Sequence, residues 1–317
     1  MGPNSAVRRH ESALSFDARL LPAVVGLETW LVALVALPAP LVARILLAAP
    51  LIIVPALLAA MPARTLPLRL TTPDLAPWAA LIAGLPLLAA FSVAAGPLAA
   101  LLSAPWIALG GVLALAALAH AVPRLPGLLR PGRSSELATD GAFGLLGVGA
   151  LFLLAHRLDV GLLGFGSTTM LLGAVHYHFL GFGLLGLVAV TARRRPWLGW
   201  LACLGIVGGM PLSAAGTALA VPPLNWLGVL IIDIGGLAAI VLLLDHARHG
   251  SVPGRLLLVS AAAALALGLS LGIGWSTSLF LGLTFLDLEA MVRTHGVLNA
   301  TGVVLAALAL LGRGRRE

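Results

Sequence analysis

Ionisable side chains are scarce in the apolar stretches of this sequence, so they mark where chemistry could take place. Five of them lie inside candidate membrane helices: Glu28, His176, His178, Asp233 and His295. A charge in hydrocarbon costs roughly 2.5–3.5 kcal/mol on insertion scales, so such residues are rare unless they have a use. Carboxyl and imidazole groups in a water-poor pocket can transfer protons at neutral pH. These five residues are therefore our candidate catalytic groups.

The distances of these residues from the expected helix ends predict that they lie in one layer. Glu28, His176 and Asp233 are about 12–14 Å below the outer surface at 1.5 Å per residue. His295 is shallower, at about 6 Å, and Asn299 shares its helix face four residues later. We expect one shared site in the outer half of the membrane. Neighbouring side chains on the same helices are candidate substrate-binding residues: Asn299, Tyr177, Arg293 and Thr169.

On a regular helix, His176 and His178 cannot both bind the same metal ion. A spacing of two residues turns their side chains about 200° apart. Both could therefore ligate one metal ion only if the helix were broken there. One of the two could instead do no more than hydrogen-bond a neighbouring helix. We assign no metal ligand and expect no cofactor.

The composition determines the kind of element that must position these residues. The chain has 317 residues, of which 60% are apolar and 10% charged, and its mean hydropathy is +1.06. Soluble domains carry about 25% charged residues, so this chain could not cover a water-facing surface. A cytosolic enzyme, a disordered chain and a disulfide-rich module are excluded, the last because Cys203 is the single cysteine. A polytopic membrane protein remains.

Apolar runs and arginines together predict the topology. An ideal membrane helix needs about 20 apolar residues. We expect an all-α transmembrane bundle, one domain over 1–317, with about ten spans at 20–37, 41–61, 76–95, 98–121, 141–156, 168–191, 197–219, 224–245, 255–275 and 291–311. Sixteen arginines fall on one side of these spans and three on the other. The positive-inside rule then predicts that both termini are cytoplasmic.

This orientation assigns three polar segments to the cytoplasm: 1–19, the loop 122–140 and the tail 312–317. The arginines are interpreted as topological anchors that face anionic lipid, so no nucleic-acid partner is expected. The predicted location is the inner membrane of a bacterial cell.

Two motifs resemble a known family. The segment AVHYHFLGF contains His176, His178 and Gly181, and MVRTHGVLNATG contains Arg293, His295, Gly296, Asn299 and Gly302. This combination, with the proline-rich stretch at 46–60, resembles the YndJ-like family of bacterial integral membrane proteins. The resemblance implies a membrane protein with a site at these two motifs, and it names no substrate.

The residues favour a membrane-embedded enzyme that performs acid–base chemistry on a lipophilic substrate. Isomerisation, cyclisation or hydration/dehydration would suit, with Asp233 or Glu28 as the acid, a histidine as the base and Asn299 orienting a substrate oxygen. No nucleophile motif, phosphate-binding loop or lysine accompanies them. The expected partners are the lipophilic substrate and membrane lipid, and the oligomeric state is left open.

Three alternatives remain open. A proton-coupled transporter of a small lipophilic molecule would use similar buried groups. It predicts polar groups in both membrane halves, whereas the sequence shows only His120 in the inner half. A metal- or haem-binding protein could use three histidines. A structural or regulatory subunit would need no chemistry, but it would leave the shared polar layer unexplained.

Overall fold

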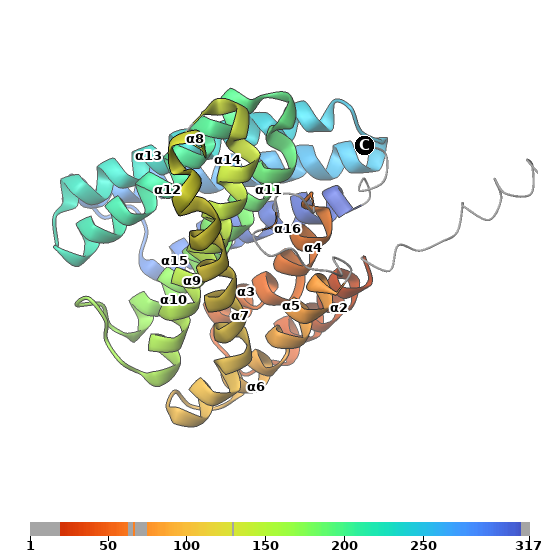
Figure 1. Cartoon of the computed structure of the whole chain (residues 1–317). Coiled ribbons are helices and arrows are strands. Elements are labelled where there is room, and N and C mark those ends of the chain that lie inside the picture. Colours follow the sequence, from red (N-terminus) through yellow and green to blue (C-terminus); the bar gives the residue numbers. More distant parts are fainter. Residues whose placement is uncertain (1–19, 63–65, 67–74, 129, 312–317) are drawn as a thin grey trace, which may run out of the picture.

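The described part of the protein is almost entirely helical (Figure 1). The structure is a computed structural model that describes residues 20–62, 66, 75–128 and 130–311. A single bridge between Leu162 and Phe165 is the only β pairing in these ranges. Helices are expected for so apolar a chain, because each backbone N–H and C=O in hydrocarbon needs a partner within its own segment. The all-α prediction is confirmed.

Eight helical stretches of the described residues are long and apolar enough to cross a membrane. They are Leu41–Ala60 (α3 Leu41–Leu46, η2 Ala49–Ile53, α4 Val54–Ala60), Pro97–Leu128 (α7 Pro97–Ala121, η4 Val122–Arg124, α8 Leu125–Leu128), Pro131–Leu158 (η5 Pro131–Arg133, α9 Ser134–Leu158), Ser167–Arg194 (α10 Ser167–His176, η6 Tyr177–Leu184, α11 Leu185–Thr191, η7 Ala192–Arg194), α12 (Pro196–Ala218), α13 (Pro222–Ala247), α14 (Val252–Phe280) and Leu288–Leu311 (α15 Leu288–Met291, η8 Val292–Gly296, α16 Val297–Leu311).

Two further apolar helices are shorter. They are α2 (Leu21–Ala36) and Ala76–Ser92, which consists of α5 (Ala76–Gly84) and α6 (Pro86–Ser92). Every predicted span therefore coincides with a helix, but two of the ten lack the length of a full span. The predicted count of about ten is not confirmed. The predicted terminal segments 1–19 and 312–317 lie outside the described residues.

The predicted loop 122–140 is largely helical. Short helices occupy Val122–Arg124, Leu125–Leu128 and Pro131–Arg133, and α9 already begins at Ser134. The prediction began this span at 141 because SSELATD is polar. Polar residues are tolerated at a helix end when they find partners, and Asp140 does so in an ion-pair cluster described below.

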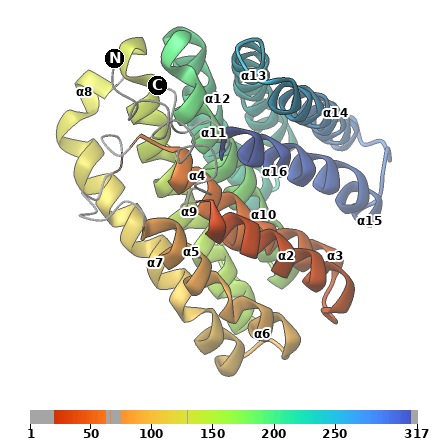
Figure 2. The ribbon, with the colours of Figure 1, turned by 90° about the vertical axis from the view of Figure 1, so that its right-hand side faces the viewer.

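Two groups of helices meet around a buried centre (Figures 1 and 2). One contains α12, α13 and α14, and the other contains α2, α5, α6 and α7. The stretch Leu41–Ala60, α9 and α10–α11 lie between them, and α16 packs along α14. Glycine permits the close approach of α2 to η2, since a Cβ on Gly26 would lie 1.6 Å from the carbonyl oxygen of Leu51.

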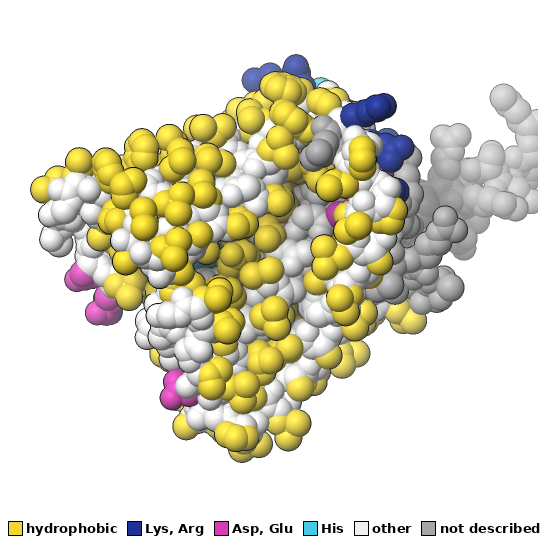
Figure 3. Space-filling model, turned by 60° about the vertical axis from the view of Figure 1, so that its left-hand side comes forward, with side chains coloured by type: hydrophobic (Ala, Val, Ile, Leu, Met, Phe, Trp, Pro, Cys, Tyr) yellow, Lys and Arg dark blue, Asp and Glu magenta, His cyan; other side chains and the backbone are white. Residues whose placement is uncertain are grey.

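The surface matches a membrane environment. Apolar side chains cover most of the face shown in Figure 3, while basic side chains gather along its upper edge and most of the visible acidic ones lie at its lower left. A broad apolar belt between two charged margins is what a bilayer requires.

Candidate functional site

The centre of the candidate site is a pair of histidines from two distant helices. His176 ends α10, and His295 lies in η8 just before α16. Their rings are stacked, with 6.1 Å between centroids and 29° between planes. Both side chains are partly buried. The sequence prediction that these two residues share a site is consistent with this geometry.

Backbone carbonyls fix the tautomer of both rings. His176 Nδ1 lies 2.7 Å from the Leu172 carbonyl oxygen, one turn earlier on α10. His295 Nδ1 lies 2.8 Å from the Gly268 carbonyl oxygen on α14. A carbonyl oxygen only accepts, so each Nδ1 carries the proton and each Nε2 keeps its lone pair. His176 Nε2 has no hydrogen-bond partner among the described residues, which leaves it available as a base.

Asn299 completes this histidine–asparagine cluster (His176, His295 and Asn299). Its Nδ2 lies 3.2 Å from His295 Nε2 and donates to that nitrogen. Its Oδ1 is buried without a hydrogen-bond partner in the described part. An unsatisfied buried acceptor is unfavourable unless something else bonds to it. Asn299 Oδ1 is therefore an unpaired acceptor that packs against Gly268 of α14.

Glycines on α14 make room for the cluster. A Cβ on Gly268 would lie 2.3 Å from Asn299 Oδ1, and one on Gly272 would lie 3.0 Å from His295 Cε1. The two glycines are four residues apart and so lie on one helix face, which lets α16 approach α14 with polar side chains between them.

Both histidines lie at π-helical segments. η6 begins at Tyr177, directly after His176, and η8 contains His295. Single π-helical turns inside α-helices occur frequently at functional sites, because they redirect side chains and interrupt the regular backbone hydrogen bonds. The irregular backbone thus coincides with both parts of the cluster.

His178 is turned away from the cluster into a closed hydrogen-bonded environment. It is fully buried, its Nδ1 bonds to the Ala174 carbonyl oxygen at 2.7 Å, and its Nε2 accepts from Trp106 Nε1 at 3.0 Å. Both ring nitrogens are therefore satisfied. Of the two neighbouring histidines, His178 is therefore the one that hydrogen-bonds an adjacent helix, as the sequence analysis considered for one of them.

Neither candidate carboxylate contacts the cluster. Asp233 lies midway along α13, 9% exposed, with no hydrogen bond or ion pair to any described residue. Glu28 is exposed on α2, in a groove beside Leu88 and Ser92 of α6. The structure therefore brings together three of the predicted polar groups and leaves the two carboxylates apart.

The remaining candidate residues also lie outside the cluster. Tyr177 packs its ring on Phe152 of α9, with 5.3 Å between centroids. Arg293 is exposed and pairs with Glu289 at 2.5 Å. Thr169 is half-buried in the first turn of α10.

The family of the chain follows from a comparison with protein-family models. The model described as "YndJ-like protein" matches residues 44–303. The chain belongs to the YndJ-like family. The match covers both histidine motifs and most of the helices, and it begins after α2 and Glu28. No curated protein and no solved structure matches the chain.

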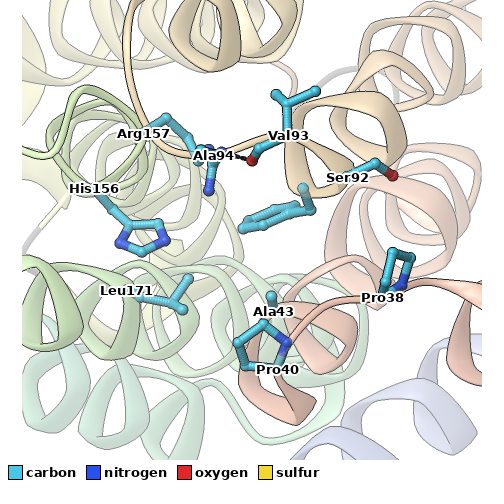
Figure 4. A pocket seen from close by; sticks show the side chains of 10 residues that line it. Pro38, Pro40, Ala43, Ser92, Val93, Ala94, His156, Arg157 and Leu171 are labelled. Atoms are coloured by element: carbon cyan, nitrogen blue, oxygen red, sulfur yellow. Dashed lines mark hydrogen bonds between the residues drawn. The ribbon is translucent and has the colours of Figure 1, made fainter.

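This YndJ-like chain also contains a buried arginine that the sequence did not single out. Arg157, near the end of α9, is 5% exposed and lines a cavity of about 370 Å³ with His156 (Figure 4). The sequence interpretation of the arginines as lipid-facing anchors is wrong for Arg157. Two features of the sequence could have drawn attention to Arg157. It is one of the three arginines on the side of the predicted spans that has few of them, and it directly follows His156.

A second unpredicted cluster lies at the other end of α9. Asp140, whose side chain is 4% exposed, pairs with His120 at 2.9 Å and with Arg124 at 3.5 Å. Glu136 pairs with Arg124 at 3.1 Å. Asp140 is 16 residues before His156, or about 24 Å along the helix. In addition to His120, which the sequence analysis named, Asp140, Glu136 and Arg124 thus form a polar cluster at this end of α9.

The arrangement suits proton transfer better than metal binding. In the ranges that the structure covers, no three His, Cys, Asp or Glu side chains lie close enough together to hold a metal ion. The cluster instead offers one unpartnered imidazole nitrogen and one unpartnered amide oxygen in an apolar setting. Those two groups can accept a proton and orient a polar substrate atom.

Proposed function

We propose that this YndJ-like protein is a membrane-embedded enzyme that uses the histidine–asparagine cluster for acid–base chemistry on a lipophilic substrate. The observation that carries the proposal is the stacked pair of His176 and His295, contributed by two membrane helices. Both rings are held by backbone carbonyls in one tautomer. Such fixed positioning of a base is what efficient general base catalysis needs.

The contacts of the cluster suggest a separate role for each residue. His176 Nε2 is the base, because it alone of the four ring nitrogens has no partner among the described residues. His295, held by Gly268 and Asn299, stays neutral and stacks its ring against that of His176, which positions the base. Asn299 would orient a polar atom of the substrate if α14 and α16 separate enough to expose its Oδ1, which is buried in this structure.

A proton shift is the simplest reaction that these groups can perform. His176 Nε2 takes a proton from one substrate carbon, and the same nitrogen returns a proton to another, so that a double bond moves. The step is redox-neutral and consumes no co-reactant. Cyclisation and hydration/dehydration would use the same groups. Asp233 is a candidate acid for such steps only if the substrate extends from the cluster to α13.

Solvent exchange tests this proposal without knowledge of the substrate. The full-length protein, in vesicles made from a lipid extract of its host, is incubated in deuterium oxide, and the lipids are screened by mass spectrometry for gained deuterium. We expect one class of lipophilic compounds to exchange. The rate of deuterium exchange into these compounds should fall by about 10²–10⁴-fold in His176→Ala and His295→Ala.

Two further variants make the test specific. Arg195→Gln, at an exposed ion pair with Asp245, should exchange at the wild-type rate. Asp233→Asn reports whether that carboxyl takes part. Exchange at the full rate in both histidine variants would refute the proposal.

A proton-coupled transporter is the second candidate, and one observation favours it. Ionisable groups lie at both ends of α9, with His156 and Arg157 at one and Asp140 at the other. A pathway that links both faces needs polar groups in both halves. Uptake of a lipophilic compound that depends on a pH gradient, together with no deuterium exchange, would establish this function instead.

The finer topology forms part of the proposal. We infer about ten membrane passages, including the two shorter helices, with both termini in the cytoplasm of a bacterial cell. Support comes from the charge asymmetry of the arginines and the separation of basic and acidic margins in Figure 3. Reporter fusions to the C-terminus would test it, since a periplasmic signal would contradict the orientation.

A further inference from the structure

Arg157 is a buried cation without an acidic partner in the described part of the chain. Its Nη2 donates to the carbonyl oxygens of Ala90 and Val93 at 2.8 and 2.9 Å. Its guanidinium carbon lies 5.0 Å from the centre of the Phe91 ring. Its Nε is buried with no hydrogen-bond partner. Buried charges are normally paired, so this arginine lacks the anion that its surroundings require.

The cavity in front of Arg157 has the composition of a binding site for an amphiphile. We call it the Arg157 cavity; its volume is about 370 Å³ (Figure 4). Three of its lining side chains are polar (Ser92, His156 and Arg157), and the others are apolar. His156 Nδ1 is committed to Ser167, so Arg157 is the main source of free hydrogen-bond donors.

An apolar groove continues from this cavity. The α2–α6 groove, of about 500 Å³, shares Pro38 and Ser92 with the Arg157 cavity. Its walls are mainly the apolar side chains Val32, Ala33, Ala36, Leu37 and Leu88. Glu28 lies at its far end, about 12 Å along α2 from Ala36. A negative charge there repels an anion, so an anionic head is directed to the Arg157 end.

We propose that the Arg157 cavity binds the anionic head of an amphiphile, a carboxylate or a phosphate, whose alkyl chain lies in the α2–α6 groove. Arg157 holds the head with charge-assisted hydrogen bonds, and the chain lies against the apolar side chains of the open groove. The inference concerns binding alone and does not depend on the proposed catalysis at His176 and His295.

Binding measurements on the purified, delipidated full-length protein test the proposal. The probes are dodecanoate, dodecyl phosphate, dodecanol and inorganic phosphate. Their binding is measured by thermal shift and by titration calorimetry. Both anionic amphiphiles should bind at least 10-fold more tightly than the neutral alcohol. Inorganic phosphate alone should bind weakly, because it lacks the chain. If a diacyl phosphatidic acid competes with the probes, the anion comes from bilayer lipid. If it does not compete, the ligand is a single-chain acid.

Variants assign the site. Arg157→Gln should weaken the binding of both anionic amphiphiles by about 10-fold or more, because hydrogen bonds to a charged group are lost. Ala94→Trp fills the exposed mouth of the cavity and keeps Arg157, so it should abolish binding while the protein remains folded. It decides the question if Arg157→Gln does not fold. Arg195→Gln should bind like wild type. Equal affinity for dodecanol and dodecanoate, or unchanged affinity in Ala94→Trp, would overturn the proposal.

Discussion

Gly268 provides the space that Asn299 occupies, and an added methyl group there tests the candidate site. In Gly268→Ala the new Cβ would lie 2.3 Å from Asn299 Oδ1 and 2.8 Å from its Cγ. Asn299 is short and buried, so it cannot move aside without leaving His295 or forcing α16 away from α14. Gly274 is the matched control on the same helix, because its Cβ would meet nothing closer than the Phe285 ring at 3.5 Å.

The expected size of the effect follows from these distances. Overpacking of this kind costs about 1–3 kcal/mol. Alanine in place of glycine gains up to about 1 kcal/mol of helix propensity, and this gain cancels between Gly268→Ala and Gly274→Ala. The first variant should therefore be less stable than the second by about 1–3 kcal/mol. A shift of about 1 Å at a reacting group can also cost on the order of 10²-fold in rate.

Both effects can be measured on the same samples. Unfolding of the protein in bicelles by added dodecyl sulfate gives the stability of each variant, and deuterium exchange into lipids gives the rate. If Gly268→Ala and Gly274→Ala are equally stable and equally active, Asn299 is not packed against α14 as described. Lower stability with an unchanged rate would retain the packing and remove Asn299 from the catalytic site.

Three more predictions concern contacts outside the cluster. Trp106→Phe removes the donor to His178 Nε2 and should lower the free energy of unfolding by about 0.5–1.5 kcal/mol. The same unfolding assay measures this loss, and an unchanged stability would mean that the Trp106–His178 hydrogen bond is not formed. Gly149→Ala places a methyl group 2.7 Å from His178 Nδ1 and should destabilise by about 1–3 kcal/mol, which a rise in unfolding midpoint would contradict. Asp140→Ala leaves His120 without its buried carboxylate and should cost about 1–3 kcal/mol; thermal denaturation that matches wild type would exclude the ion pair.

Clear physical reasons led from the sequence to the helices and to all three residues of the cluster. Apolar runs bounded by arginine, proline and glycine locate helices because hydrocarbon admits little else. His176, His295 and Asn299 were recognised because polar groups are rare in such runs. Depth along each helix predicted one polar layer, and two members of it, His176 and His295, stack their rings.

The sequence could not predict the directions of side chains. His176 and His178 are equivalent by type, and only the position of Trp106 on α7 shows that His178 belongs to another contact. The π-helical segments at 177–184 and 292–296 depend on packing between helices, which no local pattern encodes. The local sequence around Arg157 does not distinguish it from an arginine that faces lipid. Its burial depends on where the carbonyl groups of Ala90 and Val93 lie.

The short length of α2 has a consequence for the surrounding lipid. Its 16 residues rise about 24 Å, whereas the hydrocarbon core of a typical bilayer is about 30 Å thick. If α2 is one of the proposed membrane passages, this leaves a mismatch of about 6 Å, which thinning of the adjacent bilayer can accommodate at a modest energetic cost per ångström. Longer acyl chains would increase this mismatch, so bilayer thickness becomes a variable that sets how well the protein is accommodated.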